Sequence, residues 1–204
     1  MESKTLDLAP NGGRLPLLYP NELSSLQKEL HQHFQDHLIS WSKKVGFKLA
    51  LSDGRLLGPL NGFLYSPVIS KAYHQWVDVE HEHTSIPPKI RTMVILIIGT
   101  AWNSEFEIYA HSESARYLGW SEAAITSILN GEQPVGLTHT EMVAYRFAKC
   151  LMDKKNVDDD IYKQAIEAFT EKGVVELVQL IGIFLTVSVM LNVFKVPVPG
   201  VDCH

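Results

Sequence analysis

The stretch Trp102-Asn103-Ser104-Glu105-Phe106-Glu107-Ile108-Tyr109-Ala110-His111, which continues to Gly119, predicts a helix around which the fold is organised. Its apolar side is made of Phe106, Ile108, Ala110, Ala115, Tyr117 and Leu118. Ser104, Glu107 and His111 are spaced i, i+3 and i+7, so they share another face. A hydroxyl, a carboxylate and an imidazole on one face of an otherwise apolar segment make this face the candidate site of chemistry.

Glu107 and His111 lie one helical turn apart, so they can hydrogen-bond. A carboxylate beside an imidazole favours the charged imidazolium and orients its ring. The same spacing is also common in solvated pairs of small energetic value. The preceding segment, residues 93–101, is apolar on all sides, which predicts burial. A polar face that continues out of a buried helix is expected to line a cleft.

Composition and charge narrow the class of protein. The 204 residues predict a single domain over 1–204, with residues 1–20 as an extended arm that packs along the body. A net charge of −5 argues against a general nucleic-acid binder. Cys150 and Cys203 form no CxxC pair, which suits free thiols in a reducing compartment. The first twenty residues contain no apolar signal region, and we expect a cytoplasmic protein.

Residues 174–194 are almost continuously apolar and are long enough to cross a bilayer. Five polar residues interrupt them, namely Glu176, Gln179, Thr186, Ser188 and Asn192. Polar groups are costly in lipid, so we interpret the segment as a core or subunit-interface helix and expect no membrane contact. Such apolar helices also favour a homo-oligomer.

Helical periodicity and capping signals predict an all-α fold of about eight helices. The predicted ranges are 21–44 with Asn21 as N-cap, 67–80, 89–101, 102–119, a short helix capped by Ser121 up to Leu129, 138–153 with a capping box at Thr138, 158–170, and an apolar last helix after Gly173. The run 94–98 is also compatible with a buried strand. Residues 81–88 are expected to form an exposed connection.

Three other features are candidates for binding. Asn61, in Gly58-Pro59-Leu60-Asn61, either shapes a turn or points at a ligand, and composition favours the turn. Arg91 opens an apolar helix, where an arginine either pairs with an acid or meets an anionic substrate. His33 and His37 have a metal-compatible spacing, but solvated histidines are commoner and we predict no metal site.

These motifs, taken in order, resemble the carboxymuconolactone decarboxylase family, which shares the alkylhydroperoxidase D-like (AhpD-like) fold. The resemblance runs from about residue 14 to residue 200. It rests on Asp53-Gly54, Gly58-Pro59-Leu60-Asn61, the Arg91 helix, Trp102 to Glu107 with His111, Ala115 and Gly119, and Leu191-Asn192-Val193-Phe194-Lys195-Val196-Pro197. It implies all-α subunits that assemble into oligomers, with the active site at or near an interface.

The redox branch of this superfamily carries Cys-x-x-Cys-x-x-x-His and an upstream glutamate. Here Ser104 and Glu107 stand at the two cysteine positions, His111 holds the histidine, and Thr92 replaces the upstream glutamate. A disulfide cycle needs thiolates, so a peroxidase of that type is excluded.

The resemblance then implies cofactor-independent carbon chemistry, with decarboxylation of a carboxylated lactone as the first hypothesis. In it His111 delivers a proton to an enolate-like intermediate, and Glu107 holds the imidazole or acts as its proton partner. Further substrate contacts are assigned to Asn61 as a donor to the enolate oxygen, Arg91 as a carboxylate anchor, Ser104 on the same face, and Trp102, Phe63 and Tyr65 as apolar walls. Each of these is equally explicable as a core or paired residue.

Two alternatives stay open. The same acid–base pair suits a cofactor-free lyase, isomerase or cyclase acting on a larger oxygenated substrate, because function depends on the site and not on the fold. A non-catalytic oligomeric binding protein is the third hypothesis. It is favoured if His111 faces open solvent, whereas a closed apolar pocket around His111 favours the enzymes.

Overall fold

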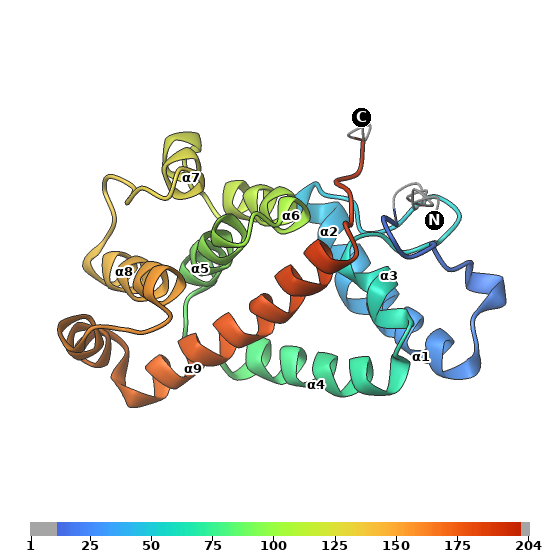
Figure 1. Ribbon diagram of the computed structural model, residues 1–204, viewed down its shortest axis with the longest axis horizontal. Helices are drawn as coiled ribbons and strands as arrows, with labels where there is room; N and C mark the ends of the chain where they lie inside the picture. Colours follow the sequence, from blue (N-terminus) through green and yellow to red (C-terminus); the bar gives the residue numbers. More distant parts are fainter. Residues whose placement is uncertain (1–11, 201–204) are drawn as a thin grey trace, which may run out of the picture. The chain divides into compact units, whose positions relative to one another are not determined.

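The computed structural model describes residues 12–200, and Figure 1 labels its helices. Over this range the chain is all-α, as predicted, with an isolated β-bridge between Ala50 and Leu56. The described chain divides into two compact units. Unit 1 takes in the residues up to Gln75 and those from Met190 onward, and unit 2 is Trp76–Val189.

Unit 1 begins its helical part at Ser24, not at the predicted Asn21. Ser24 forms a capping box with Gln27 at the start of α1 (Ser25–Phe34), whereas Asn21 lies in a short 3-10 helix, Pro20–Glu22. The helix continues through a π-helical turn (Gln35–Ile39) into α2 (Ser40–Val45). Gly46, at φ 110°, ends it. The apolar pattern predicted one helix correctly, but the π turn inside it has no signal in that pattern.

The amino-terminal arm is tied to unit 1 by hydrogen bonds from α3 (Pro59–Leu64) and the residue that follows it. The Asn61 side chain accepts from the Leu18 amide at 3.1 Å and donates to the Pro16 carbonyl at 3.1 Å. The Tyr65 hydroxyl donates to the same carbonyl at 2.7 Å. The expectation that the arm packs along the body is confirmed for its described part, and residues 1–11 lie outside the described range.

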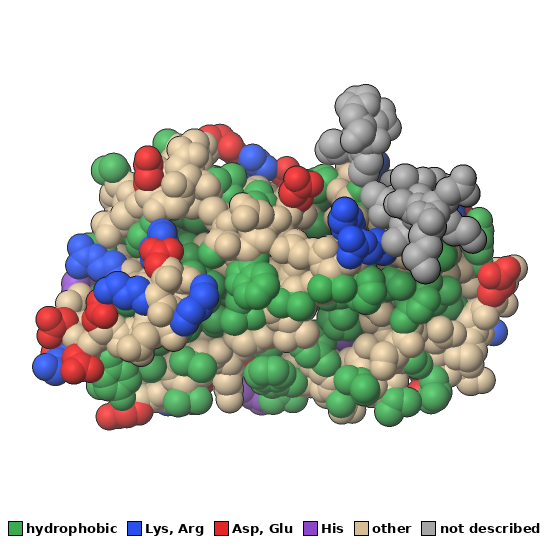
Figure 2. Space-filling view, viewed as in Figure 1, with side chains coloured by type: hydrophobic (Ala, Val, Ile, Leu, Met, Phe, Trp, Pro, Cys, Tyr) green, Lys and Arg blue, Asp and Glu red, His purple; other side chains and the backbone are tan. Residues whose placement is uncertain are grey.

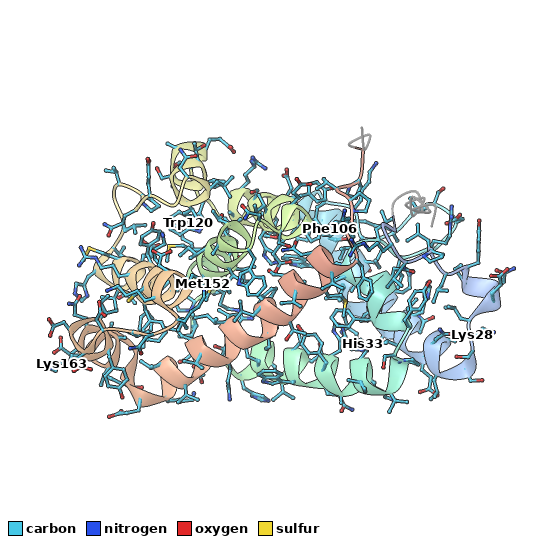
Figure 3. All side chains as sticks on the ribbon, in the orientation of Figure 1. Lys28, His33, Phe106, Trp120, Met152 and Lys163 are labelled. Carbon is cyan, nitrogen blue, oxygen red and sulfur yellow. The ribbon has the colours of Figure 1, made fainter. Side chains whose placement is uncertain are left out.

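Unit 2 is built around α5 (Pro88–Ala101), in which every residue from Ile90 to Gly99 is buried. It contacts three helices, α6 (Glu105–Tyr117), α7 (Glu122–Leu129) and α8 (His139–Lys154). Figure 3 labels three buried residues of this unit: Phe106 in α6, Met152 in α8, and Trp120 between α6 and α7. The predicted all-round burial of this segment is confirmed, and the alternative of a buried strand is wrong.

Some of the predicted helix boundaries are confirmed, and others differ from the structure by a few residues. The caps at Ser121 and Thr138 are confirmed by their hydrogen bonds to Ala124 N and Glu141 N. The helix predicted to begin at Trp102 begins at Glu105, because Asn103 takes a left-handed φ of 49° between α5 and α6. α4 (Pro67–His83) extends three residues into the segment expected to be a connection, and residues 81–83 are exposed as predicted.

The last helix, α9 (Asp159–Val193), is kinked at Thr170, where the helix predicted over 158–170 ends, and Gly173, the predicted separator, lies three residues later. Thr170 has φ 62° and ψ 173°, a conformation that no helix interior adopts. Within the described residues α9 is long and apolar enough to cross a membrane, by length and composition alone. Leu177, Leu180 and Ile181 lie in the core of unit 2, which fits the predicted core helix. Figure 2 shows that apolar side chains also reach the surface over α9.

Candidate active site

The candidate site lies in unit 2, where the end of α5 meets the start of α6. Ser104 occupies the N-cap position of α6 and is fully buried, and Glu107 is only 3% exposed. Glu107 packs directly against Gly99 of α5. A Cβ placed on Gly99 would lie 3.3 Å from both Cβ and Cγ of Glu107. The glycine therefore makes room for the carboxyl group inside the helix pair.

Burial controls the protonation of Glu107. Its Oε1 atom is shielded from solvent and has no hydrogen-bond partner among the described residues. Removal from water disfavours the carboxylate and raises the pKa of Glu107 from 4.5 to about 8. At pH 7 the side chain is therefore a neutral carboxylic acid that can donate a proton.

His111 is also neutral. The residue is half-buried, but its Nδ1 atom is shielded and has no hydrogen-bond partner in the described chain. Its ring meets Phe184 of α9 edge to face, with centroids 5.2 Å apart. Burial lowers the pKa of His111 from 6.5 to about 3, and the positive charge of Arg91 acts in the same direction.

The predicted hydrogen-bonded pair of carboxylate and imidazolium is therefore wrong in its charges. Glu107 and His111 do share one face of α6, as the spacing requires, but desolvation makes each ionised form too costly. His111 Nδ1 is shielded and not open to solvent, and the closed apolar pocket expected for an enzyme stays a prediction.

Arg91 and Glu80 form a buried ion pair in the same unit. Arg91 Nη2 donates to Glu80 Oε2 at 2.7 Å, and Nη1 donates to Oε1. Both residues are buried, at 7% and 6% exposure. Of the two roles considered for Arg91, pairing with an acid is the one observed. Glu80 was not predicted from the sequence, since an acid eleven positions away on another helix gives no periodic signal.

Buried polar atoms without hydrogen-bond partners lie close together in the sequence where α5 ends and α6 begins. Within the described residues they include Thr100 Oγ1, Ser104 Oγ, Glu107 Oε1 and His111 Nδ1. A buried polar atom without a partner costs about 1–3 kcal/mol. Four within twelve consecutive residues, from the end of α5 into α6, indicate that water or a ligand supplies the missing hydrogen bonds.

No protein-family model matches the chain, and no curated protein matches it in sequence. Solved structures do match it. An uncharacterized peroxidase-related protein from Silicibacter sp. TM1040 aligns over 96% of both chains, with 10% identity and a TM-score of 0.73. A peroxidase-related protein from Ralstonia eutropha JMP134, described as an alkylhydroperoxidase AhpD core, aligns over 93% of both chains, with 12% identity and a TM-score of 0.73.

The chain has the AhpD-like fold. The debrominase Bmp8 in complex with 2,3,4-tribromopyrrole is a further match, with 14% identity, a TM-score of 0.67, and coverage of 92% of this chain and 94% of that one. At such identities the likeness establishes the fold alone. It confirms the AhpD-like fold that the resemblance implied, and it leaves the superfamily and its decarboxylase branch as hypotheses.

In this AhpD-like chain the two positions at which the redox branch carries cysteine hold the buried Ser104 and Glu107. Cys150 is a free, buried thiol on α8 that donates to the Asn156 carbonyl at 3.5 Å. Cys203 lies outside the described residues. The exclusion of a CxxC disulfide cycle rests on the sequence, and the structure adds that the replacing side chains are buried at the site.

The other predicted site residues are placed as follows. Asn61, Phe63 and Tyr65 belong to unit 1, where Asn61 and Tyr65 bind the arm. Phe63 stacks on Tyr73 at 5.0 Å and meets the edge of His74 at 4.6 Å. Trp102 follows the last residue of α5 and is 37% exposed. Unit 2 thus brings together Ser104, Glu107, His111 and Arg91, while the contacts of Asn61, Phe63 and Tyr65 described here are structural ones inside unit 1.

A cavity of about 360 Å³ lies in unit 1, and it contains none of the acid–base residues. Its lining includes the apolar residues Ile39, Phe47 and Leu49. The described residues contain no group of three or more side chains placed to hold a metal ion. His33 and His37 instead lie ring to ring, with centroids 4.7 Å apart. The buried, unpartnered polar atoms of unit 2 therefore identify the candidate site better than cavity size does.

Proposed function

We propose that this protein is a cofactor-independent enzyme that transfers protons on an oxygenated small molecule through an enolate-like intermediate. The lyase, isomerase or cyclase hypothesis fits the site better than the decarboxylase hypothesis. The observation that carries the proposal is the pairing of a neutral acid, Glu107, with a neutral imidazole, His111, on one buried helix face. At pH 7 one group has a proton to give and the other has a lone pair to accept one.

The energetics favour two proton transfers that occur together. If His111 alone took a proton from carbon, an isolated imidazolium would form in a site that disfavours it. If Glu107 alone gave its proton to a carbonyl oxygen, an isolated carboxylate would form. When both transfers occur, the two charges appear one helical turn apart and stabilise each other.

The proton inventory of such a cycle balances. His111 takes a proton from the carbon next to a carbonyl, and Glu107 gives its proton to the carbonyl oxygen, which yields an enol. The enol hydroxyl then returns a proton to the Glu107 carboxylate, while the imidazolium protonates a different carbon of the conjugated system. The double bond has moved, and both side chains regain their starting protonation.

Decarboxylation of a carboxylated lactone is the second candidate. It is supported by the family resemblance and by the protonated Glu107, which could supply the proton that replaces carbon dioxide. However, the substrate carboxylate would enter a buried site whose one nearby arginine, Arg91, is already held by Glu80. That negative charge would have no partner, so the geometry favours the uncharged substrate.

The test is exchange of substrate carbon-bound hydrogen for deuterium in D2O, followed by proton NMR without added metal or cofactor. The panel contains unsaturated lactones, cyclic enones, a carboxylated lactone, and 2,3,4-tribromopyrrole, the ring bound by the debrominase structure. We expect exchange by the wild type to fall about a hundredfold or more in Glu107→Gln and in His111→Asn.

Glu105→Gln is the matched control, because Glu105 is an exposed acid in the first turn of the same helix. Wild-type exchange that survives in both site variants would refute the proposal. Release of carbon dioxide from the carboxylated lactone, with no exchange on the other compounds, would favour the decarboxylase instead.

The proposal includes self-association and a cytoplasmic location, both of which are sequence predictions. A single chain has a mass of 22.9 kDa. Sedimentation of the full-length protein at micromolar concentration should therefore give a larger particle. A particle of monomer mass over the whole concentration range would count against the predicted homo-oligomer.

A further inference from the structure

We propose that Glu80 is a specificity-determining residue: by occupying both terminal guanidinium nitrogens of Arg91, it keeps the site electrically neutral and restricts it to uncharged substrates. The inference rests on the proposed function only for the location of the reacting groups. It concerns the charge of the molecule that binds beside them.

The contact between the two side chains takes up one N–H of each terminal nitrogen of Arg91 and places the negative charge of Glu80 directly against the guanidinium. Arg91 Nη1 donates to one carboxylate oxygen of Glu80, and Nη2 donates to the other at 2.7 Å. The side chains of Arg91 and Glu80 are 9% and 2% exposed, so solvent does not compete for either partner. Two parallel hydrogen bonds between planar groups are the strongest arrangement available to this pair.

The formal charges of the four side chains of the site sum to zero at pH 7. Arg91 and Glu80 carry opposite charges in direct contact, and burial keeps Glu107 and His111 neutral. A carboxylate that entered this environment would be a buried ion without a counter-ion, and the cost of such an ion is several kcal/mol. The site therefore discriminates against anions without any steric obstacle.

An uncharged ring with a carbonyl oxygen meets no such penalty. The unpartnered Thr100 Oγ1 and Ser104 Oγ atoms, together with the Glu107 acid, offer hydrogen bonds that need no charge on the ligand. Phe184, edge to face with His111, supplies an aromatic side chain next to the reacting groups. The class of substrate that fits is a small, apolar, oxygenated ring without an ionised group.

The test compares two ligands that differ only in charge: a butenolide carrying a primary amide and the same butenolide carrying a carboxylate. Binding is followed by the imidazole resonances of His111 in carbon-detected NMR, assigned by their loss in His111→Asn. In the wild type we expect the amide to bind at least about tenfold more tightly than the carboxylate. In Glu80→Gln, which removes the negative charge paired with the guanidinium, we expect carboxylate affinity to rise about tenfold or more with little change for the amide.

Two further variants complete the experiment. Glu80→Gln combined with Arg91→Met removes both charges, and it should bind the amide but lose the gain in carboxylate affinity. If Glu80→Gln does not fold, because Arg91 is then buried without a partner, Glu80→Asp replaces it. The shorter side chain keeps the charge but cannot reach both nitrogens as Glu80 does, and it should give a smaller gain in carboxylate affinity.

Equal binding of the two ligands to the wild type would overturn the inference, as would an unchanged preference in the folded Glu80 variants. Absence of a His111 response to both ligands would overturn it too, because the site would then reject the uncharged ring. The readout does not require turnover. Amide binding without any deuterium exchange would refute the proposed function alone, and equal turnover of charged and uncharged lactones would refute this inference alone.

Discussion

The opposite pKa shifts of Glu107 and His111 predict a stability profile that falls on both sides of a plateau. Between pH 4.5 and about 8 the folded chain keeps the Glu107 proton that the unfolded chain has released. The free energy of unfolding therefore falls by about 1.4 kcal/mol for each pH unit of that window. Between about pH 3 and 6.5 the unfolded chain binds a proton on His111 that the folded chain excludes, so stability rises with pH there.

The two effects cancel where their windows overlap, between pH 4.5 and 6.5. From pH 6.5 to 8 only the Glu107 contribution remains, and from pH 4.5 down to 3 only the His111 contribution does. The free energy of unfolding should therefore be about 2 kcal/mol lower at pH 8, and about 2 kcal/mol lower at pH 3, than between pH 4.5 and 6.5. Over its full window Glu107 alone is worth about 5 kcal/mol, which is large compared with the net stability of a domain.

Urea unfolding followed by circular dichroism, at half-unit steps from pH 3 to 9, measures this profile. The decisive quantity is the difference between Glu107→Gln and the wild type, which cancels all other titrating groups. Relative to the wild type, the Glu107→Gln variant should gain about 5 kcal/mol in free energy of unfolding between pH 4.5 and 8. The difference between His111→Asn and the wild type should change only on the acid side, up to pH 6.5.

Glu105→Gln again serves as the control, and its difference from the wild type should stay flat across the range, because Glu105 is exposed. A flat difference for Glu107→Gln as well would mean that Glu107 is ionised in the folded protein. The neutral acid–base pair, and the reaction built on it, would then be refuted together.

Three further changes test the packing around the site and the arm. Gly99→Ala places a Cβ 3.3 Å from the Glu107 side chain, and it should displace the acid and lower deuterium exchange about tenfold at little cost in stability. Asn61→Ala removes both side-chain hydrogen bonds to the amino-terminal arm, and it should lower the free energy of urea unfolding by about 2 kcal/mol. Thr170→Gly relieves the positive φ of 62° at the kink in α9 and should raise that free energy by about 1 kcal/mol, whereas Thr186→Gly in the same helix should lower it.

Local signals predicted the helical part of the fold because capping and periodicity depend on neighbours in the sequence. Ser121 and Thr138 cap their helices as expected, and the continuous apolar pattern of α5 correctly indicated burial on every side. One prediction failed where a backbone conformation decided the boundary. Asn103 adopts a positive φ of 49° and delays the start of α6 to Glu105, whereas the helix predicted over 158–170 does end at the Thr170 kink.

The candidate site was predicted only in part, for a similar reason. Glu107 and His111 were found because both are on one helix, where spacing determines which side chains share a face. Glu80 was not found, since its contact with Arg91 joins two helices that the sequence does not orient. Asn61 was assigned to the site by resemblance, and the structure instead shows its amide bound at both ends to the arm.

The sequence by itself determined that the chain is helical, that a buried helix precedes the polar face, and that no CxxC pair is present. Only the tertiary structure decided the charges at that face. A carboxylate and an imidazole in water are expected to ionise as a pair, but α5, α6 and Phe184 remove them from water. Desolvation depends on everything packed around a group, and no spacing along the chain encodes it.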